Sequence, residues 1–498
     1  MSKVKRILSV IMAMVMVLAM SVPTFAAGTG TKPTESDSAV VTVNNVEANA
    51  TITAYQVIDA RYGDNGFLGY EWAKGVPNAG TIVADPMNAV TSDLITGLAK
   101  NPAGLTKEDG VVSGQTKLTV GTWMLIVTPP TGNQAKVYNP MVVSVYYDVN
   151  KSGDDNIAAG GTVDASMPWE LKVTDAYAKS TEIKLEKTVA DEDKDKLAEV
   201  GSLVKFKISG TIPSYSSEYN AAKYTLKDTI VNGLKYPADI APVVKVNGVK
   251  VNDGTEYTFA LTSNNQSFTI DFKSDYILGL ANKTDDERAV TVEYSSQVTA
   301  DAIAKVAENR ADLNYTSKPG EETDATSDSA FVATLSLDGL MEKVEEDETA
   351  LPDAEFTLYR NEELTDEFDT YKTVANGDIE FKGLDGDAVY YLKETKAPEG
   401  YTLNDTVYKI EFINITYDTE KVVSYDVKIT NMTTNIEVTG SINYGTQAND
   451  FATTVVNTKI SSLPSTGGIG TTIFTIGGCA IMIVAAGLFF ATRRKTQK

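Results

Sequence analysis

The sequence lacks histidine and has one cysteine, Cys479. These absences exclude zinc sites of the His/Cys type, Ser-His-Asp and Cys-His hydrolytic centres, haem ligation and iron–sulfur clusters. We therefore expect no metal and no cofactor. Positive charge is also scarce, because 44 Lys and Arg residues stand against 67 Asp and Glu residues, for a formal net charge of -23. Such an acidic chain is not expected to bind nucleic acid.

Long apolar runs occur only near the two ends of the chain. Between them the apolar residues alternate with polar ones in short runs broken by Gly, Asn, Asp and Pro, as at 51–58, 203–212 and 407–417. This pattern predicts an all-β protein built of β-sandwiches. The length of 498 residues argues for three or four domains. Helical periodicity is scarce, and a short helix is expected at 301–309.

The N-terminal segment 1–26 is typical of a secretory signal peptide. It has a basic start that ends at Arg6, an apolar stretch over 7–20, and small residues before a cleavage point near Ala26 or Ala27. The alternative is a membrane anchor that is retained. A signal peptide implies export, and an exported protein without cystines needs another covalent device to cross-link its domains.

The C-terminal segment contains an apolar stretch, 469–491, that is long enough to cross a bilayer, and a basic tail, 492–498, that holds the end in the cytoplasm. Directly before it stands Leu463-Pro464-Ser465-Thr466-Gly467. This arrangement resembles the cell-wall sorting signal of Gram-positive surface proteins. The resemblance implies that sortase cuts between Thr466 and Gly467 and transfers the Thr466 acyl group to an amine. The alternative is a plain stop-transfer helix behind a chance pentapeptide.

Removing both ends takes away seven basic residues and no acids, so the formal charge of the mature chain becomes -30. A polyanion of this kind stays soluble outside the cell. The remaining sequence divides into three predicted domains: 27–178, 179–331 and 332–461.

The third predicted domain holds a lysine, Lys343, with the strand parity of the apolar residues Leu335 and Met341. A lysine is rarely buried without a reason. Further along, Glu394 shares a face with Leu392 in the stretch YYLKETKAPEGY, and Asn457 shares a face with Val455. The order of these elements resembles the collagen-adhesin B-type (CnaB) domain, and YYLKETKAPEGY resembles the E-box of Gram-positive pilins. The expected fold class is thus a tandem array of immunoglobulin-like, CnaA- and CnaB-type sandwiches.

That resemblance implies a spontaneous isopeptide bond between Lys343 and Asn457, catalysed by Glu394. Burial lowers the pKa of a lysine and raises that of a glutamate, so both groups can be neutral. The neutral amine can then attack the amide carbon while the carboxyl group shuttles protons. The alternative is a Lys–Glu ion pair beside a hydrogen-bonded asparagine, although burying such a pair seldom gives net stability.

The middle predicted domain also has a lysine, an acidic residue and an asparagine on the apolar faces of its expected strands. Lys187 and Asp228 both continue apolar faces, and Asn309 aligns with Ala311 and the apolar residues that follow it. The run resembles the middle domain of backbone pilins, which implies a second Lys187–Asn309 bond with Asp228 as catalyst. Asn314 is the alternative acceptor, although it lies on the opposite face of its strand.

Between the first two predicted domains, the stretch from Trp169 to Lys179 resembles the pilin motif, whose lysine attacks the sortase acyl-enzyme. Lys179 takes the nucleophile position. Two departures are Ala178 in place of the usual proline and a Trp-to-Lys spacing one residue longer. Lys172 and Lys184 are nearby competitors, and an ordinary solvated linker lysine is the alternative.

Taken together, the resemblance implies the major shaft subunit of a sortase-assembled pilus: secreted, peptidoglycan-anchored, and not an enzyme apart from its own single-turnover cross-linking. The implied partners are further copies of the chain, pilus-specific and housekeeping sortases, minor pilins and peptidoglycan. The alternative function is a singly wall-anchored adhesin that binds a host surface ligand through its N-terminal domain. A third function, a secreted enzyme, would need a catalytic constellation in 28–177, and the sequence offers none there. A calcium loop at 191–195 is not expected either, because Lys196 stands where the loop needs glycine.

Overall fold

The computed structural model of the protein describes most of the chain from residue 31 onward. The described residues are 31–109, 114–130, 136–148, 162–166, 168–174, 176–190, 196–219, 221–231, 233–320, 322–448, 450–460 and 469–495. The signal peptide 1–26, the run 191–195 and the pentapeptide Leu463–Gly467 lie outside these ranges. Strands make up 51% of the structure, which confirms the predicted all-β class.

The chain forms two compact units. Unit 1 contains Met1–Lys196, Gly201–Asp301 and Ala307–Val332, and unit 2 contains Leu197–Val200, Ala302–Val306 and Ala333–Lys498. Unit 1 holds two successive sets of strands, which we call the first and second sandwich, and unit 2 holds the third. The three-domain boundaries given above remain a prediction.

The first sandwich contains thirteen strands and two helices among its described residues. Its strands are β1 (Ser38–Asn44), β2 (Thr51–Gly63), β3 (Gly66–Trp72), β4 (Ile82–Val83), β5 (Lys107–Asp109), β6 (Gln115–Thr119), β7 (Gly121–Thr128), β8 (Lys136–Tyr138), β9 (Met141–Asp148), β10 (Val163–Asp164), β11 (Glu170–Val173), β12 (Ala176–Tyr177) and β13 (Ser180–Glu182). The helices are α2 (Pro86–Ala89) and α3 (Ser92–Lys100). Helix α3 was not expected from the sequence, although Thr91 caps its N-terminus by accepting a hydrogen bond from the Leu94 backbone.

Two sheets of the first sandwich enclose one apolar core. One sheet has the order β12-β1-β6, and the larger has the order β10-β3-β2-β7-β9-β11, with β4 on β3 and β5 on β2. Strands β8 and β13 form a separate pair. Trp123, on the central strand β7, is 1% exposed and packs among residues of both sheets.

The second sandwich carries one of the two candidate cross-linking sites. Its strands are β14 (Leu185–Val189), β15 (Leu203–Thr211), β16 (Tyr224–Ile230), β17 (Leu234–Lys235), β18 (Val243–Val246), β19 (Val249–Lys250), β20 (Tyr257–Leu261), β21 (Ser267–Phe272), β22 (Ala289–Val298), β23 (Ala307–Lys318) and β24 (Glu322–Val332). One sheet has the order β14-β15-β22-β18-β19, with β17 on β22, and the other has the order β20-β21-β16-β23-β24. The first of these sheets supplies Tyr294 to the core and the second supplies Phe268, and their rings meet edge-on with centroids 4.9 Å apart. Helix α4 (Ser274–Gly279) and the 3₁₀ turn η3 (Asp286–Arg288) connect strands.

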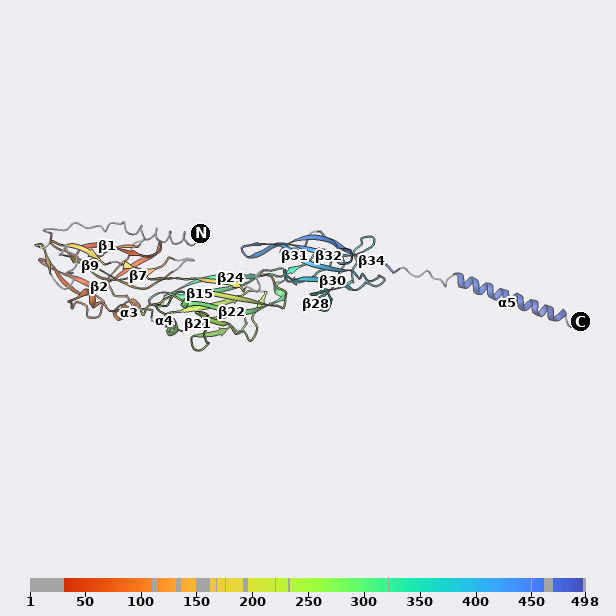
Figure 1. Cartoon of the computed structure of the whole chain (residues 1–498), viewed down its shortest axis with the longest axis horizontal. Coiled ribbons are helices and arrows are strands. Elements are labelled where there is room, and N and C mark those ends of the chain that lie inside the picture. Colours follow the sequence, from red (N-terminus) through yellow and green to blue (C-terminus); the bar gives the residue numbers. More distant parts are fainter. Residues whose placement is uncertain are drawn as a thin grey trace, which may run out of the picture. The chain divides into compact units, whose positions relative to one another are not determined.

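The third sandwich lies in unit 2. Its strands are β25 (Leu335–Ser336), β26 (Met341–Glu345), β27 (Glu355–Tyr359), β28 (Glu367–Lys372), β29 (Lys382–Leu384), β30 (Val389–Lys396), β31 (Val407–Asp418), β32 (Lys421–Asn431), β33 (Ile436–Asn443) and β34 (Thr453–Asn457). Six of them form a sheet in the order β28-β27-β30-β31-β32-β33, labelled in part in Figure 1. Strand β26 pairs with β34 in parallel, so an early strand of the sandwich lies beside its last one.

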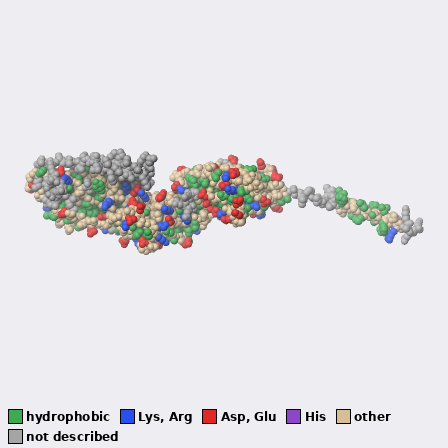
Figure 2. Space-filling model, viewed as in Figure 1, with side chains coloured by type: hydrophobic (Ala, Val, Ile, Leu, Met, Phe, Trp, Pro, Cys, Tyr) green, Lys and Arg blue, Asp and Glu red, His purple; other side chains and the backbone are tan. Residues whose placement is uncertain are grey.

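Helix α5 (Ile469–Lys495) follows the third sandwich in sequence. Its segment Ile473–Phe490 is, among the described residues, the one helical stretch long and apolar enough to cross a membrane, with a mean hydropathy of 2.3. Green apolar side chains occur along it in Figure 2 and no red ones, whereas red carboxylates are spread over the visible faces of the two units. This distribution agrees with the acidic composition of the mature chain.

The expected helix at 301–309 is wrong. The segment contains only the 3₁₀ turn η4 (Ala300–Ala302), and strand β23 begins at Ala307. Ala304 has a positive φ of 56°, which a right-handed helix does not allow. The strand carries Asn309 to the interior of the second sandwich, where the residue is 0% exposed.

Candidate cross-linking sites and linker lysine

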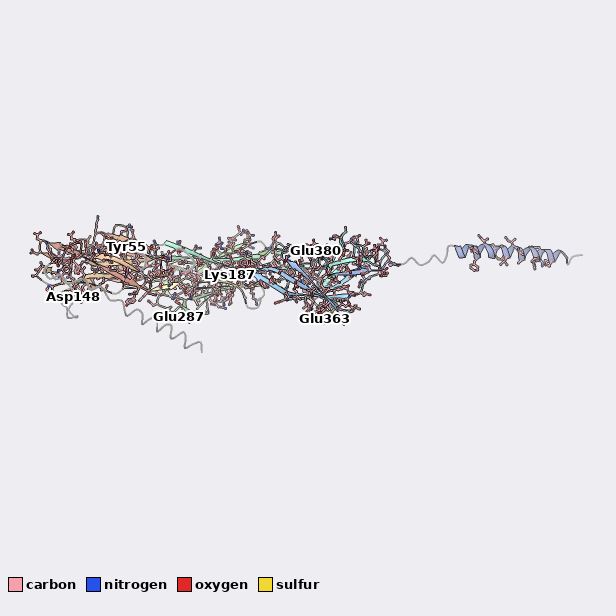
Figure 3. All side chains as sticks on the ribbon, turned by 90° about the horizontal axis from the view of Figure 1, so that it is seen from above. Tyr55, Asp148, Lys187, Glu287, Glu363 and Glu380 are labelled. Atoms are coloured by element: carbon pink, nitrogen blue, oxygen red, sulfur yellow. The ribbon has the colours of Figure 1, made fainter. Side chains whose placement is uncertain are left out.

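The second sandwich buries a lysine, an aspartate and an asparagine together in its core. Lys187, labelled in Figure 3, lies on β14 of one sheet, whereas Asp228 on β16 and Asn309 on β23 belong to the facing sheet. The side chains of Lys187 and Asp228 are fully buried, and Lys187 Nζ contacts Asp228 Oδ2. Asn309 Nδ2 donates a hydrogen bond to the hydroxyl of Tyr294 at 3.0 Å, and the same hydroxyl contacts Lys187 Nζ.

Burial governs the protonation of this pair. Loss of solvent lowers the pKa of Lys187 and raises the pKa of Asp228, and in each case the attraction of the partner opposes the shift. Both shifts favour the neutral forms, an amine and a carboxylic acid. Asn309 Oδ1 is buried and has no hydrogen-bond partner among the described residues. The alternative acceptor Asn314 is exposed on the other face of β23, as its parity predicted.

The third sandwich holds a second cluster of the same residue types. Lys343, Glu394 and Asn457 are 0%, 1% and 2% exposed. Lys343 Nζ donates to the Val455 carbonyl oxygen at 2.9 Å. Asn457 Nδ2 donates to Glu394 Oε1 at 2.7 Å, and the Asn404 backbone N–H donates to Glu394 Oε2 at 2.8 Å.

The positions of these side chains follow from strand alternation. On β30 the residues Tyr390, Leu392 and Glu394 are buried in turn, and the parallel pairing of β26 with β34 sets Lys343 opposite Val455. Burial lowers the pKa of Lys343 to about 8 and raises the pKa of Glu394. Asn457 Oδ1, like Asn309 Oδ1, is buried without a hydrogen-bond partner in the described part of the chain.

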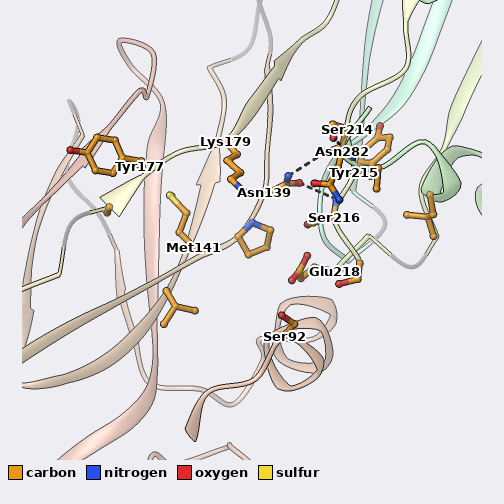
Figure 4. A pocket seen from close by; sticks show the side chains of 16 residues that line it. Ser92, Asn139, Met141, Tyr177, Lys179, Ser214, Tyr215, Ser216, Glu218 and Asn282 are labelled. Atoms are coloured by element: carbon orange, nitrogen blue, oxygen red, sulfur yellow. Dashed lines mark hydrogen bonds between the residues drawn. The ribbon is translucent and has the colours of Figure 1, made fainter. Parts of the chain in front are cut away.

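The segment between β12 and β13 holds Lys179 by its backbone and leaves its amine accessible. The Asn139 backbone N–H donates to the Lys179 carbonyl oxygen at 3.0 Å, and Asn45 Nδ2 donates to the Ala178 carbonyl oxygen at 2.7 Å. The Lys179 side chain is exposed and forms no ion pair with any residue that the structure describes. It lines a groove of about 870 Å³ in unit 1, shown in Figure 4 with Glu218 and other polar residues.

The two competing lysines are held by carboxylates. Lys172 Nζ contacts Asp148 and lies 3.4 Å from Glu170 Oε1, and the contact with Asp148 raises the pKa of Lys172. Lys184 Nζ lies 3.1 Å from Glu182 Oε2. Of the three candidates, only Lys179 has no carboxylate partner among the described residues.

Comparison with known proteins shows which families the chain resembles. Residues 339–433 match the SpaA family, described as a prealbumin-like fold domain, residues 36–166 match the T6 antigen Ig-like domain, and residues 455–498 match the LPXTG cell wall anchor motif. The trypsin-resistant surface T6 protein of Streptococcus pyogenes serotype M6 is 23% identical, over 93% of this chain and 96% of its own length. Fimbrial subunit type 2 of Actinomyces naeslundii is 26% identical, over 90% of this chain and 83% of its own length. The solved T6 backbone pilin of Streptococcus pyogenes, described as a modular three-domain structure, aligns with a TM-score of 0.62 and 19% identity over 86% of this chain and 100% of that structure.

The chain is a relative of the LPXTG-anchored major pilins. The matches support a cell-wall-anchored surface pilus as its location and a structural, non-enzymatic role in the shaft. They also agree with assembly with other pilin subunits and with attachment to the cell wall.

One departure of this chain from the expected pilin motif has a physical explanation. Ala178, which stands where the pilin motif has proline, donates its backbone N–H to the Asn44 carbonyl oxygen at 2.9 Å. Proline has no N–H and could not form this bond. The segment before Lys179 is thus ordered by a hydrogen bond to the end of β1, in place of the rigidity of a proline ring.

Sequence reasoning missed the tyrosines that surround the candidate site of the second sandwich. The hydroxyls of Tyr294 and Tyr236 contact Lys187 and Asp228, respectively, and the sequence did not indicate either tyrosine as a site residue. The alternation of AVTVEYSSQV places Tyr294 on the buried face of β22, but many tyrosines occupy such positions. Only the facing of two sheets shows which hydroxyl reaches the cluster.

Proposed function

We propose that this chain is the major shaft subunit of a covalently polymerised pilus, joined by sortase through Thr466 of one copy to Lys179 of the next. The observation that carries the proposal is the exposed Lys179 amine, which lies in a groove, has a fixed backbone and lacks a carboxylate partner in the described part of the chain. In this scheme the Thr466 acyl group forms a thioester with the sortase cysteine. The Lys179 amine attacks it, the thioester breaks, and an amide bond forms.

Repetition of this step gives a fibre. Each copy offers an acyl donor near its C-terminus and an amine acceptor in unit 1, so the contact is heterologous and does not close on itself. Pilus-specific sortase would join the copies and minor pilins, and housekeeping sortase would transfer the last Thr466 to a peptidoglycan amine. That last transfer would anchor the fibre to the cell wall.

The proposal includes two isopeptide bonds within each copy. In the third sandwich, neutral Lys343 attacks Asn457 Cγ, the protonated Glu394 carboxyl polarises the amide and passes protons, and ammonia leaves. The burial of all three side chains and the hydrogen bond from Asn457 to Glu394 support this step. Lys187, Asn309 and Asp228 would form the corresponding bond in the second sandwich.

These bonds would give the shaft its resistance to force. Strand β26 lies near the beginning of the third sandwich and β34 at its end, and the two are adjacent and parallel. A covalent link between Lys343 and Asn457 would carry tension from one strand directly to the other. The intervening strands could then not be pulled out without breaking a covalent bond.

An immunoblot of wall extracts tests the polymer. A shaft subunit gives an SDS-resistant ladder that disappears with Lys179→Ala and persists with the matched control Lys184→Ala, since Lys184 is paired with Glu182. A single band in the parent strain would instead support the singly anchored adhesin. Tandem mass spectrometry of the ladder should recover Lys179 joined to Thr466, and recovery of Lys172 joined to Thr466 would show that Lys179 is the wrong nucleophile.

The mass of the full chain tests the internal bonds. Each bond removes one ammonia, so two bonds lower the mass by two ammonia molecules. The Glu394→Ala and Asp228→Ala variants should each restore one of them. An unmodified theoretical mass for the parent chain would refute both bonds and leave Lys187 in contact with Asp228 and Lys343 hydrogen-bonded to the Val455 carbonyl oxygen.

A further inference from the structure

A tyrosine hydroxyl bridges the two nitrogen atoms that would exchange places in the second sandwich. The Tyr294 oxygen contacts Lys187 Nζ and accepts a hydrogen bond from Asn309 Nδ2 at 3.0 Å. In the proposed reaction, Lys187 Nζ is the attacking atom and Asn309 Nδ2 is the leaving atom. A hydroxyl that touches both can accept a proton from one and donate its own to the other.

In the third sandwich, a proton can reach the leaving nitrogen without a tyrosine. There the carboxylate of Glu394 itself contacts the leaving nitrogen, Asn457 Nδ2, at 2.7 Å. In the second sandwich the catalyst is Asp228, whose side chain is shorter by one methylene group. Its two oxygens contact Lys187 and the Tyr236 hydroxyl, and among the described residues it forms no hydrogen bond with Asn309.

We propose that Tyr294 is a catalytic residue of the second sandwich, where its hydroxyl carries the proton from Lys187 Nζ to Asn309 Nδ2. This inference rests on the proposed Lys187–Asn309 bond. Asp228 first takes the ammonium proton of Lys187, and the Tyr236 hydroxyl donates to its other oxygen. Nζ then attacks Cγ of Asn309.

The step balances within the cluster. A bond forms between Lys187 Nζ and Asn309 Cγ, and one Nζ proton passes to the Tyr294 oxygen while the Tyr294 hydroxyl proton passes to Nδ2. The Cγ–Nδ2 bond breaks, ammonia leaves, and the hydroxyl is regenerated. No other reactant is needed.

The position of this hydroxyl is fixed by its ring. Tyr294 stacks on Phe206 with centroids 5.9 Å apart and meets Phe268 edge-on, and Lys187 Nζ lies 4.5 Å from the Tyr294 ring centroid. Phenylalanine keeps all of these ring contacts and removes only the oxygen. Tyr294→Phe is therefore a selective test of the proton transfer.

The experiment follows cross-linking in the full chain during cell-free synthesis in detergent, with samples taken over time and mapped by tandem mass spectrometry. In the parent chain we expect both the Lys187–Asn309 and the Lys343–Asn457 peptides. Tyr294→Phe should slow the Lys187–Asn309 bond at least tenfold, within the range of general acid–base catalysis, and leave the other bond unchanged. The matched control is Tyr224→Phe, because Tyr224 is a buried tyrosine of the same sandwich whose hydroxyl has no hydrogen-bond partner among the described residues.

The outcomes distinguish the Tyr294 relay from the Lys187–Asn309 bond on which it rests. Cross-linking of Tyr294→Phe at the parent rate would overturn the relay and leave the bond itself intact, whereas absence of the Lys187–Asn309 peptide from the parent chain would overturn both. If limited trypsin digestion of the undenatured Tyr294→Phe chain cleaves its second sandwich, a ring-fluorinated tyrosine at position 294 replaces that variant, since it keeps the hydroxyl in place and lowers its pKa. The relay predicts a rate of Lys187–Asn309 bond formation that changes with that acidity, and an unchanged rate would overturn it.

Discussion

Replacing Glu394 with glutamine should uncouple the fold of the third sandwich from its proposed covalent bond. Glutamine preserves the shape of the side chain and an oxygen that can accept from Asn457 Nδ2 or the Asn404 N–H, both of which contact Glu394. It cannot donate and recover a proton as a carboxylic acid does. Glu394→Gln should therefore fold with Lys343 and Asn457 unjoined.

The size of the effect follows from the loop that the bond would close. Asn457 lies 114 positions after Lys343. If the bond acts like a disulfide on the unfolded state, a loop of this length contributes about 5 kcal/mol. For a sandwich of this size, about 3–5 °C per kcal/mol gives a loss of roughly 15–25 °C in the unfolding temperature.

The assay heats the full chain, applies a protease at each temperature, and reads the peptides of the third sandwich by mass spectrometry. The matched control is Glu411→Gln, the same change on the neighbouring strand β31. Glu411 is partly exposed and forms ion pairs with Lys409 and Lys428 at 2.9 and 2.8 Å. Exposed pairs of this kind contribute up to about 1 kcal/mol, so the control should lose at most a few degrees.

Two results would contradict this reasoning. A Glu394→Gln chain that still shows the loss of ammonia would mean that the carboxyl group is not the catalyst. A chain that keeps its ammonia and unfolds at the parent temperature would mean that the closed loop does not stabilise the sandwich through its unfolded state.

Three further predictions concern protonation and packing. Burial lowers the pKa of Lys343 to about 8, so the neutral fraction of its amine rises with pH up to that value. The Lys343–Asn457 bond should therefore form about tenfold faster at pH 7 than at pH 6, as measured by mass spectra taken over time. An equal rate at the two pH values would show that the amine is not the titrating group. Trp123→Ala should destabilise the first sandwich by about 3–5 kcal/mol in denaturant unfolding, since the ring is fully buried, and a change below about 1 kcal/mol would mean that the core collapses around the cavity. Gly121 has φ +144°, and a Cβ there would lie 2.4 Å from the Ile58 carbonyl oxygen. Gly121→Ala should therefore lower the free energy of unfolding by roughly 1–3 kcal/mol in the same denaturant assay. An unchanged free energy of unfolding would contradict this prediction.

The sequence predicted the burial of the cross-linking residues because strand alternation is a local property. The parity of Lys187, Asp228 and Asn309 with their apolar neighbours indicated inward orientation, and all three are buried. The same parity separated Asn309 from the exposed Asn314. Their catalytic and bonding roles, and that of Lys179, stay proposals.

Secondary structure was predicted wrongly from the sequence where short segments could form either a helix or a strand. The segment 301–309 contains helix-forming alanines, yet the positive φ of Ala304 and the pairing of β23 with β16 and β24 direct its last residues into a strand. Helix α3 was missed because it is only nine residues long and lies among strands. Short segments such as these gain most of their stability from tertiary packing.

The sequence by itself determined that this chain is exported, acidic, without histidine or cystine, built of alternating strands, and equipped with an LPXTG anchor, because these properties depend on composition and on residues close together along the chain. Only the tertiary structure decided which groups meet. Lys187 and Asn309 are 122 positions apart and come from facing sheets, and the Tyr294 hydroxyl contacts both of them. Lys179 is the candidate lysine whose amine lacks a carboxylate partner in the described chain. Such contacts depend on the packing of two sheets and on strand register, and neither is encoded in any single stretch of sequence.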